Sequence, residues 1–305
     1  MTGLKRILFT FVWIALPLAC FSQPMRFAFY NAENVFDTLR NPAKEDAEFT
    51  PQGAKAWDGR KYRTKIDHTA QVIADLSPGI LGMAEVENDA VLSDLVKEIK
   101  KKSSRIYAFI RLESGDERGI DPALLYDPAI FSPVGKEMLR SPLNQRGILH
   151  VKGMMKAAGD TLHVFVNHWT SRYMGQKATE AARIDMARLL AQTVDSILAI
   201  QKNAKVIAFG DLNDTPDEKS VQYLQAYAPA LKAHNTVDTP TYYYKGEWLS
   251  FDQIFTNFAV ESSATRVFTR PYMLEENGIP LRTFSGPVYK GGYSDHLPVF
   301  IDLFL

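Results

Sequence analysis

Short apolar runs alternate with longer amphipathic segments along most of the chain. In the longer segments apolar residues recur every three or four positions, as Ile66, Val72, Ile73 and Leu76 do, and this spacing is typical of helices. Helices are expected at residues 65–76, 90–99 and 179–198, and strands at residues 26–30, 79–84, 106–110, 123–126, 147–154, 161–166, 205–209, 251–256 and 299–303. Taken alone, this alternation suggests a parallel sheet covered by helices. Residues 40–61, which are polar and interrupted by proline and glycine, predict a long surface loop.

The N-terminal residues differ from the rest of the chain. A basic pair precedes an apolar run that ends at Cys20-Phe21-Ser22, a pattern typical of a secretory signal peptide. We expect residues 1–22 to be this signal peptide and residues 23–305 to form one domain. The protein is therefore expected to be exported, either secreted or periplasmic. A lipid anchor on Cys20 is the alternative.

Composition narrows the function classes. The chain has 35 basic and 35 acidic residues, and this balance disfavours a protein that coats nucleic acid. Its 305 residues, 46% of them apolar, suffice for a large hydrophobic core. The one cysteine falls within the expected signal peptide, so the mature chain is expected to use neither disulfides nor a cysteine nucleophile. We expect a monomer with no protein partner and no membrane span.

Polar residues capable of catalysis follow directly after several expected strands. They occur at residues 31–34, 85–88, 167–169 and 211–214, with Asp252, Asp295 and His296 further along. A single residue of this kind is more often a turn or cap residue, but a series favours one shared site beyond the strand ends. Carboxylate and amide oxygens suit Mg²⁺, or Mn²⁺ or Ca²⁺, whereas zinc normally recruits more histidine or cysteine.

These segments carry a resemblance to a known family. They read YNAEN at 30–34, MAE at 83–85, RGIDPALLY at 118–126, NHW at 167–169, GDLN at 210–213 and SDHLP at 294–298. In this order, over nearly the whole mature chain, the series resembles the endonuclease/exonuclease/phosphatase superfamily, the DNase-I-like phosphohydrolases. The resemblance implies an α+β fold, a four-layered α/β/β/α sandwich whose two packed, mostly antiparallel sheets carry the site at one edge.

The resemblance also implies a metal site. Glu85 would be the principal ligand of a divalent cation, with Asn31 beside it. Glu33 lies where relatives often carry an acidic residue that can bind metal, and Asp295 would help to bind the cation.

The catalytic set follows from the same resemblance. Asp211 and Asn213 would hold the attacking water or the leaving-group oxygen, together with the phosphate. Asp252 would position His296, whose imidazole can exchange protons near neutral pH. Whether His296 or another group is the base is left open by the sequence.

Further residues complete the expected site. His168 resembles the second histidine of the nuclease branch, and Asp121 is the candidate that orients it. Arg118 and Arg172 flank site segments and could bind a phosphate through paired N–H groups, with surface ion pairs as the equal alternative. The three tyrosines at 242–244 are interpreted as core aromatics, with a wall that stacks on a base as the alternative.

The leading hypothesis is an exported, divalent-metal-dependent phosphohydrolase that cleaves phosphodiesters, with DNA or RNA as substrate. The neutral charge speaks against nucleic acid, because binding a phosphate backbone normally recruits lysine and arginine. A second hypothesis is a phosphatase or phosphodiesterase acting on lipid head groups or small phosphorylated metabolites. A third is a catalytically silent relative that binds a ligand in the same crevice.

Overall fold

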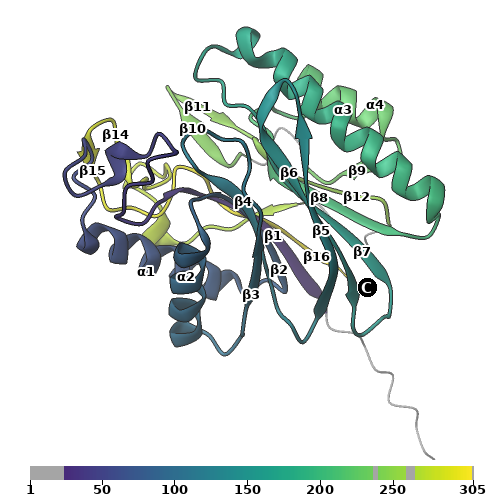
Figure 1. Cartoon of the computed structure of the whole chain (residues 1–305), viewed down its shortest axis with the longest axis horizontal. Helices are drawn as coiled ribbons and strands as arrows, with labels where there is room; N and C mark the ends of the chain where they lie inside the picture. The colour runs from purple at the N-terminus through teal and green to yellow at the C-terminus, as the bar shows by residue number, and fades with distance from the viewer. Residues whose placement is uncertain (1–23, 236–239, 259–264, 304–305) are drawn as a thin grey trace, which may run out of the picture.

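The computed structural model describes residues 24–235, 240–258 and 265–303. Two six-stranded sheets lie face to face, and a pair of helices covers the outer face of each sheet (Figure 1). The four-layered sandwich that the resemblance implied is confirmed. The expected signal peptide and the alternative lipid anchor lie outside the described residues.

The first sheet has the order β13-β16-β1-β2-β4-β3. Its strands are β1 (Met25–Val35), β2 (Ile80–Val86), β3 (Ala108–Arg111), β4 (Asp121–Tyr126), β13 (Arg266–Val267) and β16 (Val299–Leu303). Only β1 and β2 pair in parallel among its described strands. The first and last long strands of the chain are therefore neighbours, which closes the domain.

The second sheet has the order β5-β6-β7-β8-β12-β9. Its strands are β5 (Phe131–Ser141), β6 (Asn144–Met155), β7 (Thr161–His168), β8 (Lys205–Asp211), β12 (Asp252–Thr256) and β9 (Lys232–Ala233). Here only β7 and β8 are parallel among the described pairs. The parallel sheet suggested by alternation alone is thus wrong. Strand β5 was missed because its outer-edge residues are largely exposed and polar.

The helices begin where their sequences supply caps. Helix α1 (Gly59–Leu76) starts after Asp58, whose carboxylate accepts the backbone N–H groups of Arg60 and Lys61. Helix α2 (Asp89–Lys102) starts after Asn88, which accepts from the N–H of Val91. These two helices pack on the first sheet, and α3 (Gln176–Ile200) and α4 (Lys219–Tyr227) pack on the second. None of the helices in the described ranges has the length and apolar character that crossing a membrane requires.

The inner core lies between the two sheets. Phe27 and Phe29 of β1 meet Val164 of β7, Phe209 of β8 and Ile254 of β12 there, all fully buried. Burying each such side chain contributes about 1.5–3 kcal/mol. Gly82 of β2 is required at this layer, because a Cβ atom there would lie 2.1 Å from the ring of Phe209. The two sheets therefore approach closely just before the strand ends that carry the polar residues.

The connections at one edge of the sandwich add small elements of their own. The expected surface loop contains a 3₁₀ helix, η1 (Ala47–Phe49), and α1 begins earlier than its apolar spacing suggested. Phe49 stacks on Phe36 with ring centroids 4.2 Å apart, and Trp57 packs beside them. The hairpins β10 (Tyr242–Tyr244) with β11 (Glu247–Leu249) and β14 (Phe284–Ser285) with β15 (Val288–Tyr289), and the 3₁₀ helix η2 (Pro271–Met273), complete the described elements. Buried aromatics thus hold part of this loop against the domain.

Candidate active site

Polar residues meet at one edge of the sandwich because the strands before them end there. In the first sheet β1 and β2 run parallel, and Asn31 lies in register with the residue before Glu85. In the second sheet β7 and β8 run parallel, and His168 pairs with Asp211. The antiparallel strand β12 starts at the same edge, which places Asp252 opposite Asp211. Register within each sheet, together with the packing of the two sheets, therefore brings residues from five strands together.

Unusual backbone conformations mark this edge. Glu33, Glu85 and Asn213 have φ values of 52°, 64° and 51°, in the left-handed region that residues other than glycine rarely adopt. Side chains of the site stabilise these turns: Glu85 Oε2 accepts the N–H of Asn34 at 2.9 Å, and Asp211 Oδ1 accepts the N–H of Asn213 at 2.9 Å. Such strain is retained mainly where function depends on it.

Asp211 is the centre of the arrangement. Its Oδ2 accepts the side-chain N–H of Asn31 at 3.0 Å, which links the two sheets. The Nε2 atoms of His168 and His296 lie 3.8 Å and 3.7 Å from the same oxygen. Burial raises the pKa of Asp211 to about 6, with His296 acting in the opposite direction and Asp252 adding to the rise. A carboxylate of this pKa can exchange a proton near neutral pH.

His296 is oriented by Asp252. Its Nδ1 lies 2.8 Å from Asp252 Oδ2, and both side chains are buried. Burial alone would lower the pKa of His296, but the charges of Asp252 and Asp211 raise it well above its usual value of 6.5. His296 is therefore held as an imidazolium, with Nδ1–H donated to Asp252 and Nε2–H directed toward Asp211.

His168 is held in the opposite state by Arg146. Nη1 of Arg146 lies 2.7 Å from Nε2 of His168. Since a guanidinium can only donate, Nε2 must accept, and the ring proton then sits on Nδ1. Burial, Arg146 and Arg118 together lower the pKa of His168 well below 6.5. The two histidines of the site thus carry different charges.

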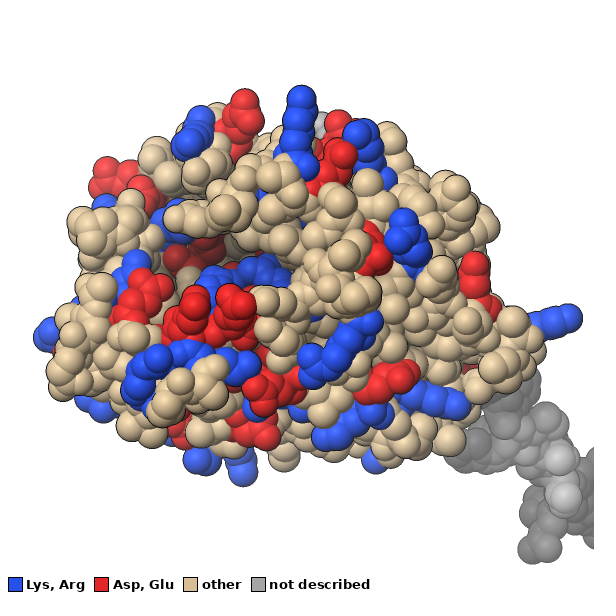
Figure 2. Space-filling model, turned by 45° about the horizontal axis from the view of Figure 1, so that its top comes forward, with Lys and Arg blue, Asp and Glu red and all other residues tan. Residues whose placement is uncertain are grey.

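A cavity of about 720 Å³ opens at this edge. Its walls carry carboxylates, histidines and cations from both sheets, together with loop residues, and include Glu85, Arg118, Arg146, His168, Asp211, Asn213, Asp295 and His296. Figure 2, which brings this edge forward, shows acidic and basic side chains gathered around a hollow. Glu48 and Lys55 from the η1 region and Gly286 from the β14–β15 hairpin reach the same cavity. The site is therefore enclosed by loops of the first half and the last third of the chain.

A comparison of the sequence with known protein families shows which family the chain belongs to. Residues 26–304 match the model of the Endonuclease/Exonuclease/phosphatase family. The chain belongs to this family. No curated protein sequence matches the chain closely enough to count as a relative.

Solved structures of the endonuclease/exonuclease/phosphatase family share the fold. The mannosyl-6-phosphatase Bt3783 of Bacteroides thetaiotaomicron is 18% identical, with a TM-score of 0.64 over 92% of this chain and 100% of that one. Truncated TDP2 of Caenorhabditis elegans is 16% identical, with a TM-score of 0.62 over 92% and 98% of the two chains. The human Nocturnin catalytic domain with bound sulfate is 16% identical, with a TM-score of 0.60 over 92% and 94%. At these identities the likeness establishes the fold, and this family member's chemistry must be argued from its own residues.

The four expected metal ligands fall into two groups. Glu85 and Asp295 line the cavity. Asn31 is buried beneath them, with Oδ1 accepting the N–H of Glu33 at 3.0 Å. Glu33 itself accepts the N–H of Thr283 at 2.6 Å and does not belong to the cavity wall. Burial, followed by the charge of Asp295, raises the pKa of Glu33 to about 7. The structure thus brings Glu85 and Asp295 to the cavity and leaves Asn31 and Glu33 behind it.

Two of the expected site residues have other partners in this structure. Asp121 does not orient His168, because its carboxylate accepts from the N–H of Ser114 at 2.7 Å and from the guanidinium of Arg111. Arg172 forms ion pairs, which was the equal alternative to phosphate binding. It donates to the carbonyl of Asn213 at 2.6 Å and to the carboxylates of Asp214 and Glu218. Arg172 therefore supports the turn that carries Asn213, whose amide donates to the carbonyl of Trp169 at 3.1 Å.

Other residues of the site were missed by the sequence analysis. Arg146 contacts His168, and Asp116 accepts from its Nε at 3.0 Å. Tyr242, interpreted as core, lines the cavity, and its ring centroid lies 4.7 Å from that of His296. The available signal for Arg146 was its place just before an apolar strand. Nothing in that placement distinguishes it from an exposed turn cation.

Proposed function

We propose that this member of the endonuclease/exonuclease/phosphatase family is a divalent-metal-dependent hydrolase that cleaves phosphodiesters. The observation that carries the proposal is the convergence of Glu85, Asp211 and His296 on one cavity. A silent binding protein has no need of a buried imidazolium beside a carboxylate of raised pKa. The enzyme hypothesis is therefore preferred to the binding one.

The cavity residues fit a divalent cation. Glu85 offers the carboxylate oxygens that Mg²⁺, Mn²⁺ and Ca²⁺ prefer, and Asp295, whose Oδ2 accepts from Nη2 of Arg282 at 2.7 Å, offers its Oδ1. Among the described residues, Oε1 of Glu85 accepts no hydrogen bond, and Nε2 of the neutral His168 lies 3.7 Å from it. When bound there, a divalent cation would neutralise charge on the phosphate oxygens and favour ionisation of a water.

Asp211, Asp252 and His296 could also be regarded as a metal site, since they offer ligand atoms within 4.8 Å of one another. Their hydrogen bonding favours proton transfer instead. His296 already donates Nδ1–H to Asp252, so its Nε2–H is available to a phosphate oxygen or to a leaving alkoxide. Asp211 is placed to accept a proton from the attacking water. His168, held neutral by Arg146, is assigned to neither role.

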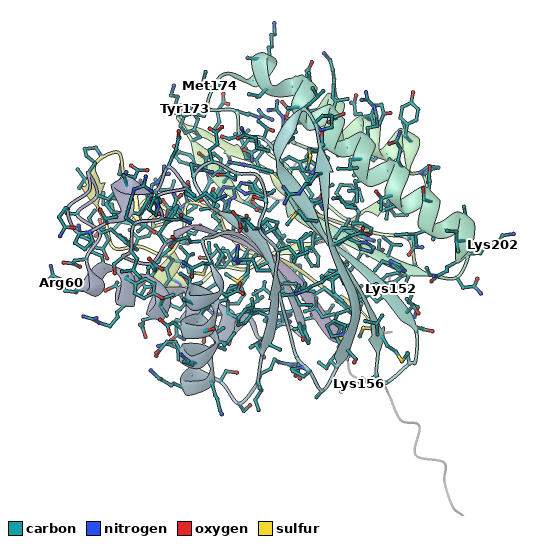
Figure 3. All side chains as sticks on the ribbon, viewed as in Figure 1. Arg60, Lys152, Lys156, Tyr173, Met174 and Lys202 are labelled. Carbon is teal, nitrogen blue, oxygen red and sulfur yellow. The ribbon has the colours of Figure 1, made fainter. Side chains whose placement is uncertain are left out.

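A nuclease is the first candidate within this reaction class. It is supported by the paired histidines, which resemble those of the nuclease branch. The substrate proposed here is a single phosphodiester in a nucleic acid, either at the end of a strand or within an unpaired strand. Figure 3 shows the labelled lysines 152, 156 and 202 well away from Tyr173 and Met174, which lie near the cavity mouth. These three lysines therefore do not form a row beside the cavity mouth that could bind the phosphates of a double helix.

A phosphatase or phosphodiesterase for small phosphorylated compounds is the second candidate. The observation that favours it is the size of the cavity, since about 720 Å³ lies within the range of small-molecule sites, roughly 300–1,000 Å³. Loops from the η1 region and the β14–β15 hairpin limit the space around the scissile bond. A compact phosphoester would fill such a site.

One assay panel tests the function and separates the candidates. The substrates are bis-p-nitrophenyl phosphate, p-nitrophenyl phosphate, single-stranded DNA, plasmid DNA, RNA and sphingomyelin. Each is tested with Mg²⁺, Mn²⁺ or Ca²⁺ and then with EDTA. Metal-dependent turnover of DNA or RNA is expected for the nuclease, and turnover confined to small esters for the second candidate. No turnover with any cation would reject both.

Export is proposed from the N-terminal pattern of basic, apolar and small residues. The expected mature protein begins at Gln23. Mass spectrometry of the protein from the periplasm or the medium tests this, because an N-terminal peptide that starts at Met1 would contradict cleavage. A lipid-modified Cys20 would instead support the anchored alternative.

A further inference from the structure

Asp116 joins two arginines at one wall of the cavity. Its Oδ2 accepts from Nε of Arg146 at 3.0 Å, and its Oδ1 lies 3.5 Å from Nε of Arg118. The carboxylate is itself fixed, since Oδ1 also accepts the backbone N–H of Arg118 at 2.9 Å. Both arginines line the same cavity as His168 and Asp211. The two guanidinium groups are therefore anchored by their Nε edges.

Each guanidinium group keeps a donor that no described residue accepts. Nη1 of Arg146 is used by His168 Nε2 and by the carbonyl of Trp169, each at 2.7 Å. Its Nη2 makes no hydrogen bond to any described residue. Nη2 of Arg118 is buried and also has no partner in the described part of the chain. A buried charged donor without an acceptor is unfavourable, so a ligand whose oxygens accept hydrogen bonds would fit this wall.

The charge of this wall points to the same kind of ligand. The two guanidinium groups share one carboxylate as their ion-pair partner, and the charges of Glu85 and Asp211 also act on Arg146. Burial and the nearby charge of Arg118 lower the pKa of Arg146, as expected when two cations lie close together. The carboxylates Glu85 and Asp295 are the groups placed to bind a cation instead. An anion bound between the arginines would relieve their repulsion.

We propose that Arg118 and Arg146 form an arginine clamp that binds the nonbridging oxygens of the substrate's phosphate. The clamp deepens the proposed function and rests on it. Paired N–H groups of guanidinium match the spacing of phosphate oxygens, which a lysine does not reproduce. Arg146 touches His168, which lies 3.8 Å from Asp211, so a phosphate held by the clamp lies beside the proton-transfer groups. Asp116 is a positioning residue, because it acts through the two arginines.

Binding of inorganic phosphate in the presence of EDTA tests the clamp without metal or turnover. The purified protein is expected to bind phosphate in a calorimetric titration. Arg118→Ala and Arg146→Ala should each weaken the affinity at least about tenfold, and Arg146→Lys should lie between Arg146→Ala and wild type. Arg60→Ala is the matched control, because Arg60 is an exposed arginine of α1 on another side of the molecule (Figure 3). Equal affinity in wild type and both alanine variants, or no phosphate binding by the wild type, would overturn the clamp.

A structural role for the arginines is tested separately. Arg118 is 39% exposed in its side chain, and in the described part of the chain its one ion pair is with Asp116, so Arg118→Ala should unfold at the wild-type temperature. In steady-state assays both alanine variants are expected to raise KM by more than they lower kcat. If the protein hydrolyses esters but all variants bind phosphate equally well, the clamp is disproved and the proposed function stands. If phosphate binding requires both arginines but no ester is cleaved, the phosphate site stands and the proposed function is disproved.

Discussion

The imidazole of His296 and the carboxylate of Asp252 form a buried pair, with Nδ1 and Oδ2 separated by 2.8 Å. Asp252 opens strand β12, whereas His296 lies just before β16, so the two sheets must pack correctly for the pair to exist. Burial opposes the imidazolium, yet the two neighbouring carboxylates raise the pKa of His296 well above 6.5. The fold thereby keeps a proton donor at the cavity at neutral pH.

Asp252→Asn should remove the charge that favours the imidazolium while leaving the metal ligands in place. We expect kcat to fall at least about 100-fold, within the range found for general acid–base groups. The measurement is kcat as a function of Mg²⁺ concentration, and the concentration for half-maximal rate should stay close to wild type. Asp302→Asn, which affects an ion pair with Arg26 at the opposite end of β16, is the control. A wild-type kcat for Asp252→Asn would disprove the role of the pair.

Glu85→Gln should act through the metal instead. The amide keeps the size of the side chain but loses its charge, so the concentration of Mg²⁺ or Mn²⁺ for half-maximal rate should rise at least about tenfold. Raising the metal concentration should restore part of the rate, which it should not do for Asp252→Asn. Glu98→Gln is the control, because Glu98 is a partly exposed residue of α2 that pairs with Lys101. If Glu85→Gln and wild type titrate with the metal identically, Glu85 is not a ligand.

Much of this site could be predicted because its residues follow apolar strands. Glu85, Asp211 and His296 each follow or precede a strand that is visible from its hydrophobic run alone. The resemblance added the sandwich, which alternation could not supply, because β1 with β2 and β7 with β8 produce the pattern of a parallel sheet at only two places.

The rest depended on pairings that a sequence does not encode locally. Asp121 and Asp252 are both acidic residues at strand starts, and only the register of β12 against β8 decides which one reaches a histidine. Arg183, on an amphipathic helix, is fully buried against Asp214 at 2.8 Å. Arg146 and Asp116 meet through the packing of a loop on the start of β6. These contacts join segments far apart in the chain.

Acid should destabilise the protein through a histidine outside the site. Burial, followed by the charge of His150, lowers the pKa of His163 to about 4, and Nδ1 of His163 lies 2.9 Å from Nε2 of His150. The unfolded chain binds this proton near pH 6.5, so the contribution to stability is present above pH 6.5 and is lost as the pH falls toward 4. The loss amounts to at most about 3 kcal/mol for a shift of this size. Urea unfolding of wild type and His163→Gln between pH 7 and 4 checks this, and parallel stability curves would contradict it.

The tight contact between Gly82 of β2 and Phe209 of β8 should control both the stability of the protein and the geometry of the site. Gly82 and Glu85 lie on the same strand, β2, and Phe209 and Asp211 both lie on β8, so the contact of Gly82 with Phe209 lies just beneath the cavity. In Gly82→Ala the new Cβ would lie 2.1 Å from the Phe209 ring, and overpacking of this kind costs about 1–3 kcal/mol. Separation of β2 from β8 should also move Glu85 away from Asp211 and lower kcat. Gly135→Ala is the control, because its Cβ would meet only Lys152 at 4.0 Å, and we expect a change within about 0.5 kcal/mol. Thermal unfolding and kcat measured on the same samples test both effects, and a Gly82→Ala protein as stable and active as Gly135→Ala would show that the sheets can separate freely there.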